Sequence, residues 1–182
     1  MRSRLTPAPP QASGSGPGAA PGRGRMMRFV LLFALYLVIF AFGLKLPLAD
    51  RLIESWARFN ATAAAAVTRV LGFDGHSSGN QLSSGGTSLS VGRACAGVEA
   101  MMIFAAALLA FPSTWSRRLT GLLAGILAIL AFNVLRLVNL LLVAVRFPEH
   151  LELFHIYIWQ TLIVVLAFAT FLAWGTLFAN RR

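Results

Sequence analysis

The chain has 182 residues, of which 57% are hydrophobic and only 12% are charged, and its mean hydropathy is +0.72. This balance excludes an ordinary soluble domain and indicates a membrane protein, long enough for one compact helical bundle. The formal net charge is +10, but the arginines flank apolar runs rather than forming one patch. Their distribution favours a role in membrane topology over nucleic-acid binding.

The first 25 residues are rich in Pro, Gly, Ala and Ser, a composition that cannot bury enough apolar surface to fold. We therefore predict a disordered cytoplasmic tail over residues 1–25 and a membrane domain over residues 26–182. An apolar run at residues 29–46, interrupted only by Lys45, approaches the roughly 20 residues that span a bilayer. No clear small-residue cleavage site follows it, so we predict a retained anchor helix.

The next segment, residues 50–72, mixes charged residues with apolar residues at helical spacing. It is too charged to span a membrane and predicts a helix that lies at the membrane surface or packs on the bundle. Residues 72–94 are rich in Gly and Ser. Within them, residues 81–91 predict two short strands around a Gly85-Gly86 turn, with an irregular loop as the alternative.

Three further apolar helices are predicted, at residues 97–111, 119–145 and 153–178. Pro112 and Pro148 follow the first two, and proline interrupts a helix. The predicted fold class is therefore an all-α membrane protein. It has about four transmembrane helices, an interfacial helix and a short outward-facing loop or hairpin.

The orientation follows from the rule that basic residues mark the cytoplasmic side. The arginines before residue 29, those of loop 113–118 and the C-terminal pair place both termini and this loop in the cytoplasm. Four spans satisfy all three assignments. Segment 47–95 and the short loop 146–152 are then outside, where Arg146 opposes the rule.

Arg136 lies within the apolar helix 119–145, where an arginine is costly unless it is paired or faces a polar cavity. Asn133, Arg136 and Asn139 are spaced three apart and form a polar stripe along one side of the helix. The stripe indicates either a functional site or a set of hydrogen bonds that hold helices together.

Cys95, the only cysteine, precedes the predicted helix 97–111, and cysteine is often a small buried apolar residue. Its place after the Gly/Ser segment and beside Gly97 favours an exposed sulfur. A helix N-terminus and nearby cations would lower the pKa of this thiol.

His155 lies at the start of the helix 153–178, close to Tyr157 and Trp159. A histidine in such an aromatic belt is often only interfacial. His150 competes for the same role, but it lies in a polar loop beside Glu149 and is expected to be solvated. His76 lies in the Gly/Ser segment without a supporting pattern.

The predicted topology brings Cys95, Arg136 and His155 to the same side of the membrane. Arg136 lies nine residues before the end of its predicted helix, about 13 Å along the axis. The three can therefore meet only if the site is sunk into the bundle or this helix projects outward. Glu99, one turn after Cys95 and expected to be buried, could pair with Arg136 or hold His155.

A thiol, an imidazole and a guanidinium together suit acyl transfer. The Cys95 thiolate would attack a carbonyl and form a thioester, while His155 moves the proton. Arg136 would stabilise the oxyanion or orient the substrate. The sequence contains no metal-ligand cluster, no Gly-rich phosphate loop and no serine elbow, so we expect no metal and no other cofactor.

Three short stretches resemble the exosortase/archaeosortase family, most closely its exosortase H branch: residues 94–101, residues 133–137, and His155 followed by Tyr157 and Trp159. The resemblance covers about residues 28–180. Many relatives have Ser or Asn where this chain has Ala96, whereas the cysteine and the glycine of that motif are present.

The resemblance implies a multi-pass cysteine transpeptidase or protease of the cytoplasmic (inner) membrane. Such proteins act on exported proteins that end in a short motif, a transmembrane helix and a basic cluster. They cleave near the motif at the outer face and pass the product to an acceptor. By motif match, Cys95 would be the nucleophile and Arg136 and His155 would complete the site, with Glu99 and Asn133 in support. The expected partners are these substrates and membrane lipid, and no nucleic acid.

The alternative is a non-catalytic membrane scaffold or assembly factor whose Arg136 stripe binds a partner helix. A transporter has less support, because the four predicted spans show no internal repeat of the kind that builds secondary transporters.

Overall fold

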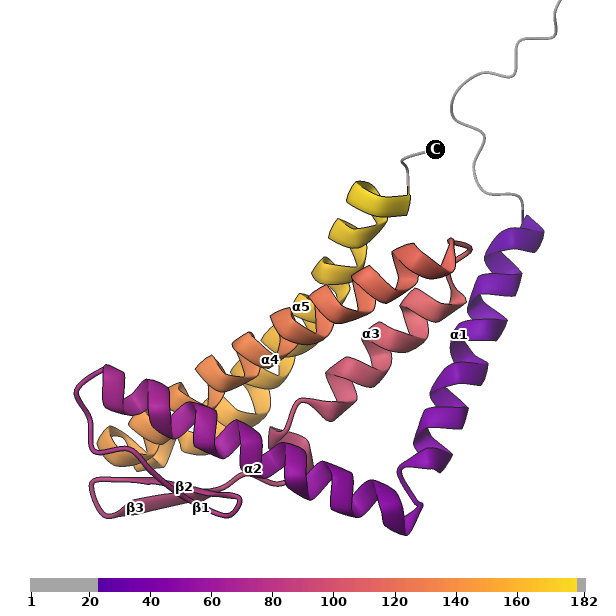
Figure 1. The fold of residues 1–182 in the computed structure, drawn as a ribbon. Coiled ribbons are helices and arrows are strands. Elements are labelled where there is room, and N and C mark those ends of the chain that lie inside the picture. Colours follow the sequence, from indigo (N-terminus) through magenta and orange to yellow (C-terminus); the bar gives the residue numbers. More distant parts are fainter. Residues whose placement is uncertain (1–22, 180–182) are drawn as a thin grey trace, which may run out of the picture.

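The computed structural model describes residues 23–179, which form a helical bundle with a small antiparallel sheet at one end (Figure 1). The long elements are α1 (Arg23–Gly43), α2 (Pro47–Val70), α3 (Val98–Ala110), α4 (Trp115–Arg146) and α5 (Gln160–Trp174). The strands are β1 (His76–Ser78), β2 (Gln81–Ser84) and β3 (Thr87–Ser90). Short 3-10 helices are η1 (Arg93–Cys95) and η2 (Pro148–His150), and π-helical segments are η3 (Leu153–Trp159) and η4 (Gly175–Ala179).

Within residues 23–179, three helices are long and apolar enough to cross a membrane: α1, α4 and the continuous helix Leu153–Leu177 that contains η3 and α5. The fourth predicted span, α3, is equally apolar but has 13 residues. Its length of about 20 Å is shorter than the roughly 30 Å of a hydrocarbon core. It lies among α1, α4 and α5 and contacts all three. The chain is an all-α membrane protein, as the sequence predicted.

The first helix begins earlier than its apolar run. Residues 23–25, assigned to the predicted disordered tail, are the first residues of α1, and the rest of that tail lies outside the described residues. Because each residue added to an existing helix gains a backbone hydrogen bond, a helix can continue past its apolar run into a basic segment.

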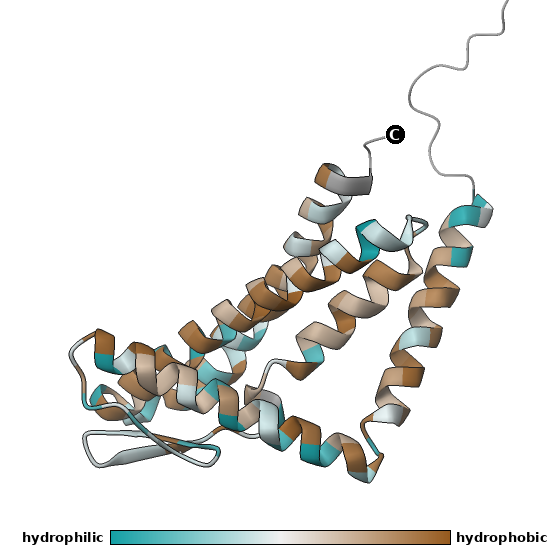
Figure 2. Ribbon diagram, viewed as in Figure 1, coloured by the Kyte–Doolittle hydropathy of each residue, from teal (hydrophilic) through white to brown (hydrophobic). Residues whose placement is uncertain are grey.

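The charged segment after α1 forms α2, which packs on α4 and the sheet as the amphipathic pattern predicted. Hydrophilic residues recur along α2, whereas α3, α4 and α5 are mostly apolar (Figure 2). Pro47 and Asp50 lie in its first turn, where a proline and an acidic residue suit the helix start. Its buried face consists mainly of alanines, so its backbone approaches its neighbours closely.

The Gly/Ser segment contains the predicted hairpin and one additional strand. β2 and β3 pair antiparallel around Gly85 and Gly86, whose φ angles of 56° and 79° suit a two-residue turn that glycine favours. β1 was not predicted, because its three residues are polar and exposed and show no alternation. The strand order is β1-β2-β3, and the buried Leu82 of β2 anchors the sheet in the core.

The two ends of the bundle differ. In Figure 1, the first turn of α1, the connection between α3 and α4, and η4 lie at one end, whereas α2, the sheet and η1 lie at the other. At the first end, Trp174 Nε1 donates a hydrogen bond to the Arg117 carbonyl at 3.0 Å. Arg25, Arg28 and Arg118 line a shared cavity there. The predicted topology requires this grouping of the basic segments.

Candidate active site

Cys95 and His155 meet at the end of the bundle that carries the sheet. The Cys95 Sγ lies 2.9 Å from the His155 Nε2, although the two residues are 60 apart in the chain. Cys95 is the last residue of η1 and is half-buried, and His155 lies in the π-helical segment η3. π-helical turns within α-helices are frequent at functional sites, because they redirect side chains. The predicted approach of these two side chains is therefore present in the structure.

Arg136 lies in the protein interior beside this pair. Its side chain is 1% exposed, and its charge interacts electrostatically with Cys95 and Glu99. The sequence placed Arg136 well before the end of its helix and so left open how it could reach Cys95 and His155. The structure explains this, because the C-terminal part of α4 contacts η3 and extends to the sheet. At its far end, Val145 lies next to the Gly85 turn of the hairpin. The helix thus continues beyond Arg136 to the sheet, and Arg136 interacts electrostatically with the thiol.

Asn133 holds the cysteine segment in place. Its Nδ2 donates hydrogen bonds of 2.9 Å to the Cys95 carbonyl and to Asn60 Oδ1. Asn60 in turn donates to the Trp56 carbonyl, and Trp56 Nε1 donates to the Ala96 carbonyl at 2.9 Å. Asn133 and Asn60 are both 0% exposed. This chain of hydrogen bonds, which we call the asparagine clamp, fixes the backbone on both sides of the Cys95–Ala96 peptide bond.

The glycine after Ala96 is required by the same arrangement. Gly97 precedes α3 with a φ of 71°, a conformation that residues with a Cβ rarely adopt. A Cβ at this position would lie 3.2 Å from the side-chain amide of Asn133. The glycine therefore allows the chain to turn from η1 into α3 while Asn133 stays close to the backbone.

The third residue of the polar stripe positions the histidine segment. Trp159 Nε1 donates a hydrogen bond of 2.8 Å to Asn139 Oδ1, which joins the end of η3 to α4. Asn133 and Asn139 therefore connect α4 to the elements that carry Cys95 and His155, respectively. Two of the three side chains of the stripe thus make hydrogen bonds between elements, which is one of its two predicted roles, at the place where the candidate catalytic side chains meet.

The electrostatic prediction for Cys95 was wrong in sign. Burial raises the pKa of the Cys95 thiol, and this exceeds the opposing effects of the Arg136 charge and a backbone hydrogen bond from Gly92. A partly buried sulfur loses more from desolvation of its thiolate than it gains from one cation. The raised pKa favours the neutral thiol over the thiolate, and the neighbouring imidazole is positioned to accept its proton.

Glu99 differs from the expectation that it is buried. Its side chain is exposed on the first turn of α3, where it interacts electrostatically with Arg136. α3 turns this residue outward because its buried positions, such as Ala100 and Phe104, lie on another face. His150 pairs with Glu149 at 3.2 Å and His76 with Asp74 at 2.7 Å. Both are exposed, as expected for histidines outside the site.

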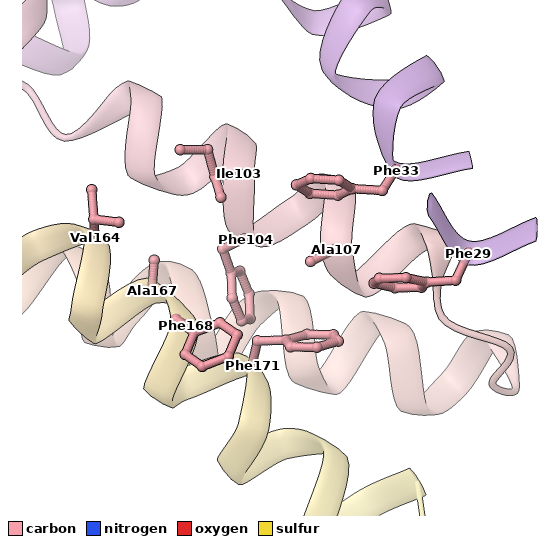
Figure 3. A pocket seen from close by; sticks show the side chains of 9 residues that line it. All are labelled: Phe29, Phe33, Ile103, Phe104, Ala107, Val164, Ala167, Phe168 and Phe171. Carbon is pink, nitrogen blue, oxygen red and sulfur yellow. The ribbon is translucent and has the colours of Figure 1, made fainter. Parts of the chain in front are cut away.

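A small cavity of about 100 Å³ opens at the thiol. Leu137 and Leu140 of α4 line it together with Cys95, His155 and the end of β3. A larger apolar cavity of about 390 Å³ lies between α1, α3 and α5 (Figure 3). Phenylalanines such as Phe29, Phe104 and Phe171 surround it, and it contains no group that could react. Of these two cavities, only the smaller is lined by side chains that could react.

Sequence reasoning missed Trp56 and Asn60. They lie one helical turn apart on α2, and only the polar Asn60 within an alanine-rich face could have signalled a buried partner. Among residues 23–179, no group of His, Cys, Asp and Glu could hold a metal ion. The side chains that the site offers are a nucleophile, a base and a cation, which together can form and resolve an acyl-enzyme.

Comparison with known proteins identifies the family. The sequence model described as Transmembrane exosortase (Exosortase_EpsH) matches residues 19–175. A search among curated proteins and a search among solved structures found no match. The matched region contains Cys95, Arg136 and His155 and the residues of the asparagine clamp. The chain therefore belongs to the transmembrane exosortase family.

Proposed function

We propose that this protein is a cysteine transpeptidase or protease that cleaves C-terminal sorting signals of exported proteins and transfers the product to an acceptor. The observation that carries the proposal is the 2.9 Å contact between Cys95 Sγ and His155 Nε2 beside the buried Arg136. A structural cysteine in an apolar core needs neither an imidazole nor a cation. Family membership supports the same chemistry.

In the first half-reaction, His155 Nε2 takes the proton of the Cys95 thiol as the sulfur attacks the substrate carbonyl. The C–N bond of the scissile peptide then breaks, and the departing amine takes the proton from His155. The substrate is left as a thioester on Cys95. The raised pKa of this thiol favours a proton transfer concerted with the attack over a preformed thiolate.

In the second half-reaction, an acceptor gives its proton to His155 and attacks the thioester carbonyl. The new acyl bond forms as the C–S bond breaks, and the proton returns to the sulfur. Arg136 stabilises the negative oxygen that develops in both steps, because a fixed cation in a water-poor site acts strongly on such a charge. Asn133 holds the nucleophile's backbone, and Glu99 balances part of the charge of Arg136.

The location of this chemistry follows from the basic segments. We infer that the bundle end with Arg25, Arg28 and Arg118 is cytoplasmic, together with both termini and the tail over residues 1–25. The candidate site at the opposite end then faces the outer side of the cytoplasmic membrane. The membrane domain over residues 26–182 would meet its substrates there after their export.

The scaffold alternative required the Arg136 stripe to bind a partner helix. Asn133 and Arg136 are at most 1% exposed, and Asn133 and Asn139 bond to other elements of this chain. The two buried residues of the stripe therefore offer no open face to a second helix, and the partly exposed Asn139 is already bonded to Trp159, so the contacts favour catalysis over the alternative.

The test is co-expression with an exported reporter that ends in a candidate motif, a transmembrane helix and an arginine cluster. We expect the wild-type protein to shorten the reporter on an immunoblot and Cys95→Ala to leave it intact while accumulating equally. Cys95→Ala suits this comparison because it removes the sulfur without adding bulk. Processing that persists in Cys95→Ala would contradict the proposal.

A further inference from the structure

The outer edge of β3 is the feature that the proposed chemistry does not use. In a two-residue hairpin the residues that flank the turn, here Ser84 and Thr87, form a hydrogen-bonded pair, and such pairs alternate along the strands. The Val91 N–H donates to the Asn80 carbonyl at 2.8 Å, which fits the same alternation. The backbone groups of Ser88 and Ser90 therefore point away from β2.

Few of these outward groups are used within the chain. The Ser90 carbonyl accepts a hydrogen bond of 3.1 Å from the Gly92 N–H. Among residues 23–179, the Ser88 N–H and carbonyl and the Ser90 N–H have no backbone partner. β3 is also the last strand of the sheet, and both serine side chains are exposed. The edge thus offers an unpaired donor, acceptor and donor in sequence.

This edge borders the cavity that contains the thiol. Leu89 and Ser90 form one wall, and Leu151 and His155 line the cavity from η3 and the turn before it. The half-buried Cys95 lines the same cavity. A volume of about 100 Å³ accommodates one or two side chains. It cannot contain an α-helix, whose diameter is about 10 Å. The shape and the unpaired backbone groups therefore both suit an extended peptide.

We propose that the segment of the substrate next to the scissile bond binds as a fourth strand along β3. This inference rests on the proposed function and adds to it the mode of substrate recognition. Main-chain hydrogen bonds to Ser88 and Ser90 hold the peptide, as in other cases of strand addition to an exposed edge. Because alternate side chains of a strand point to one face, every second substrate residue faces the small cavity at the thiol. The carbonyl of the scissile peptide bond, which lies between two such residues, reaches Cys95.

The probe is the peptide electrophile acetyl-Ala-Ala-Val-Ala chloromethyl ketone, from which a cysteine sulfur displaces chloride. Its rate of labelling Cys95 in the full-length membrane protein is divided by the rate for iodoacetamide, which has no strand-forming backbone. The test variant is Ser88→Pro, which removes the outward N–H but no hydrogen bond to β2. The matched control is Ser88→Ala, which changes the side chain and keeps the N–H.

We expect Ser88→Pro to lower the peptide-to-iodoacetamide ratio roughly three- to tenfold, the effect of one lost hydrogen bond, and Ser88→Ala to leave it unchanged. A second series on the wild-type protein uses the probe with single backbone N-methyl groups. Methylation at alternate positions should lower the ratio, because only alternate N–H groups of an added strand face β3. This series is independent of how Ser88→Pro folds.

Strand addition is overturned if the peptide probe has no advantage over iodoacetamide, if Ser88→Pro keeps that advantage, or if N-methylation acts without alternation. An advantage that falls as the protein is concentrated would show that a second copy of the chain occupies the edge, and would also overturn it. None of these results requires substrate processing. They are therefore distinct from processing that persists in Cys95→Ala, which contradicts the proposed function itself.

Discussion

The two halves of α4 pack in different ways. Its N-terminal half, with Gly121, Gly125 and Ile129, meets α3 and α5 in an apolar core. A Cβ on Gly125 would lie 2.1 Å from the ring of Phe104, so the backbone of the helix and the aromatic ring are in direct contact. This is the small-residue packing that joins helices in membranes, where no hydrophobic effect drives association.

The C-terminal half of the same helix buries polar side chains among its apolar ones. Asn133, Arg136 and Asn139 lie on a side of the helix where the first half buries glycine and isoleucine, and two of the three side chains hydrogen bond to other elements. Buried polar groups in a bundle are costly unless they are satisfied. One half of α4 therefore provides stability, whereas the other uses hydrogen bonds to position Cys95 and His155.

The largest effect is expected from removing the base that the polar half of α4 helps to position. We expect His155→Ala to lower substrate processing by roughly 10²- to 10⁴-fold, because no other described group lies against the Cys95 sulfur to take its proton. The matched control is His150→Ala, an exposed histidine five residues earlier, which should process at the wild-type rate. Quantitative immunoblotting of reporter processing measures both. Equal losses in the two variants would refute the role of His155.

A change in the apolar half should affect stability rather than chemistry. Gly125→Leu forces a side chain into the ring of Phe104 and should destabilise the protein by about 3 kcal/mol. Gly175→Leu is the control, since nothing lies within 4 Å of a Cβ there. Thermal unfolding in detergent measures both.

Adding Phe104→Ala to Gly125→Leu should restore the melting temperature, which would show that contact with the ring of Phe104 causes the loss of stability. A Gly125→Leu variant that melts like the wild type would contradict this assignment, whether or not it still processes the reporter.

A change in the asparagine clamp should have an effect of intermediate size. Asn60→Leu removes the acceptor of Asn133 and should lower kcat roughly tenfold with KM little changed, because the nucleophile loses its fixed position while the substrate surface stays intact. Thr62→Ala, on the exposed side of α2, is the control. Kinetics with purified protein and reporter measure both. A raised KM at constant kcat would instead place Asn60 in substrate binding.

The smallest expected effect is a shift in the titration of the nucleophile. Burial raises the pKa of Cys95, so its alkylation by iodoacetamide should increase with pH up to values above the ordinary range for cysteine. Because the Arg136 charge lowers this pKa, Arg136→Gln should move the curve to still higher pH and slow alkylation at neutral pH. Arg146→Gln, at the exposed end of α4, is the control. An unchanged or downward shift in Arg136→Gln would separate Arg136 from the thiol.

Much of the molecule could be read from the sequence because periodicity and composition are local. The apolar runs predicted the helices, Gly85-Gly86 predicted the hairpin, and the spacing of Asn133, Arg136 and Asn139 predicted one polar stripe. The partners of the stripe could not be read, because Asn60 and Trp56 are brought to it only by the packing of α2 on α4.

Two local expectations failed for related reasons. The pKa of Cys95 depends on how much solvent the folded chain removes from the sulfur, which no sequence motif records. The outward position of Glu99 depends on which face of α3 meets its neighbours, and an almost uniformly apolar helix gives no periodic signal of that face.

The central claim is that Cys95 carries the substrate during the reaction. The most direct measurement is the intact mass of the purified protein quenched in acid during turnover of the reporter, with and without hydroxylamine, which cleaves thioesters. We predict a mass increase equal to the cleaved substrate, located at Cys95, lost with hydroxylamine and not formed by Cys95→Ala. Processing without such an adduct, or an adduct that persists in Cys95→Ala, would contradict the account.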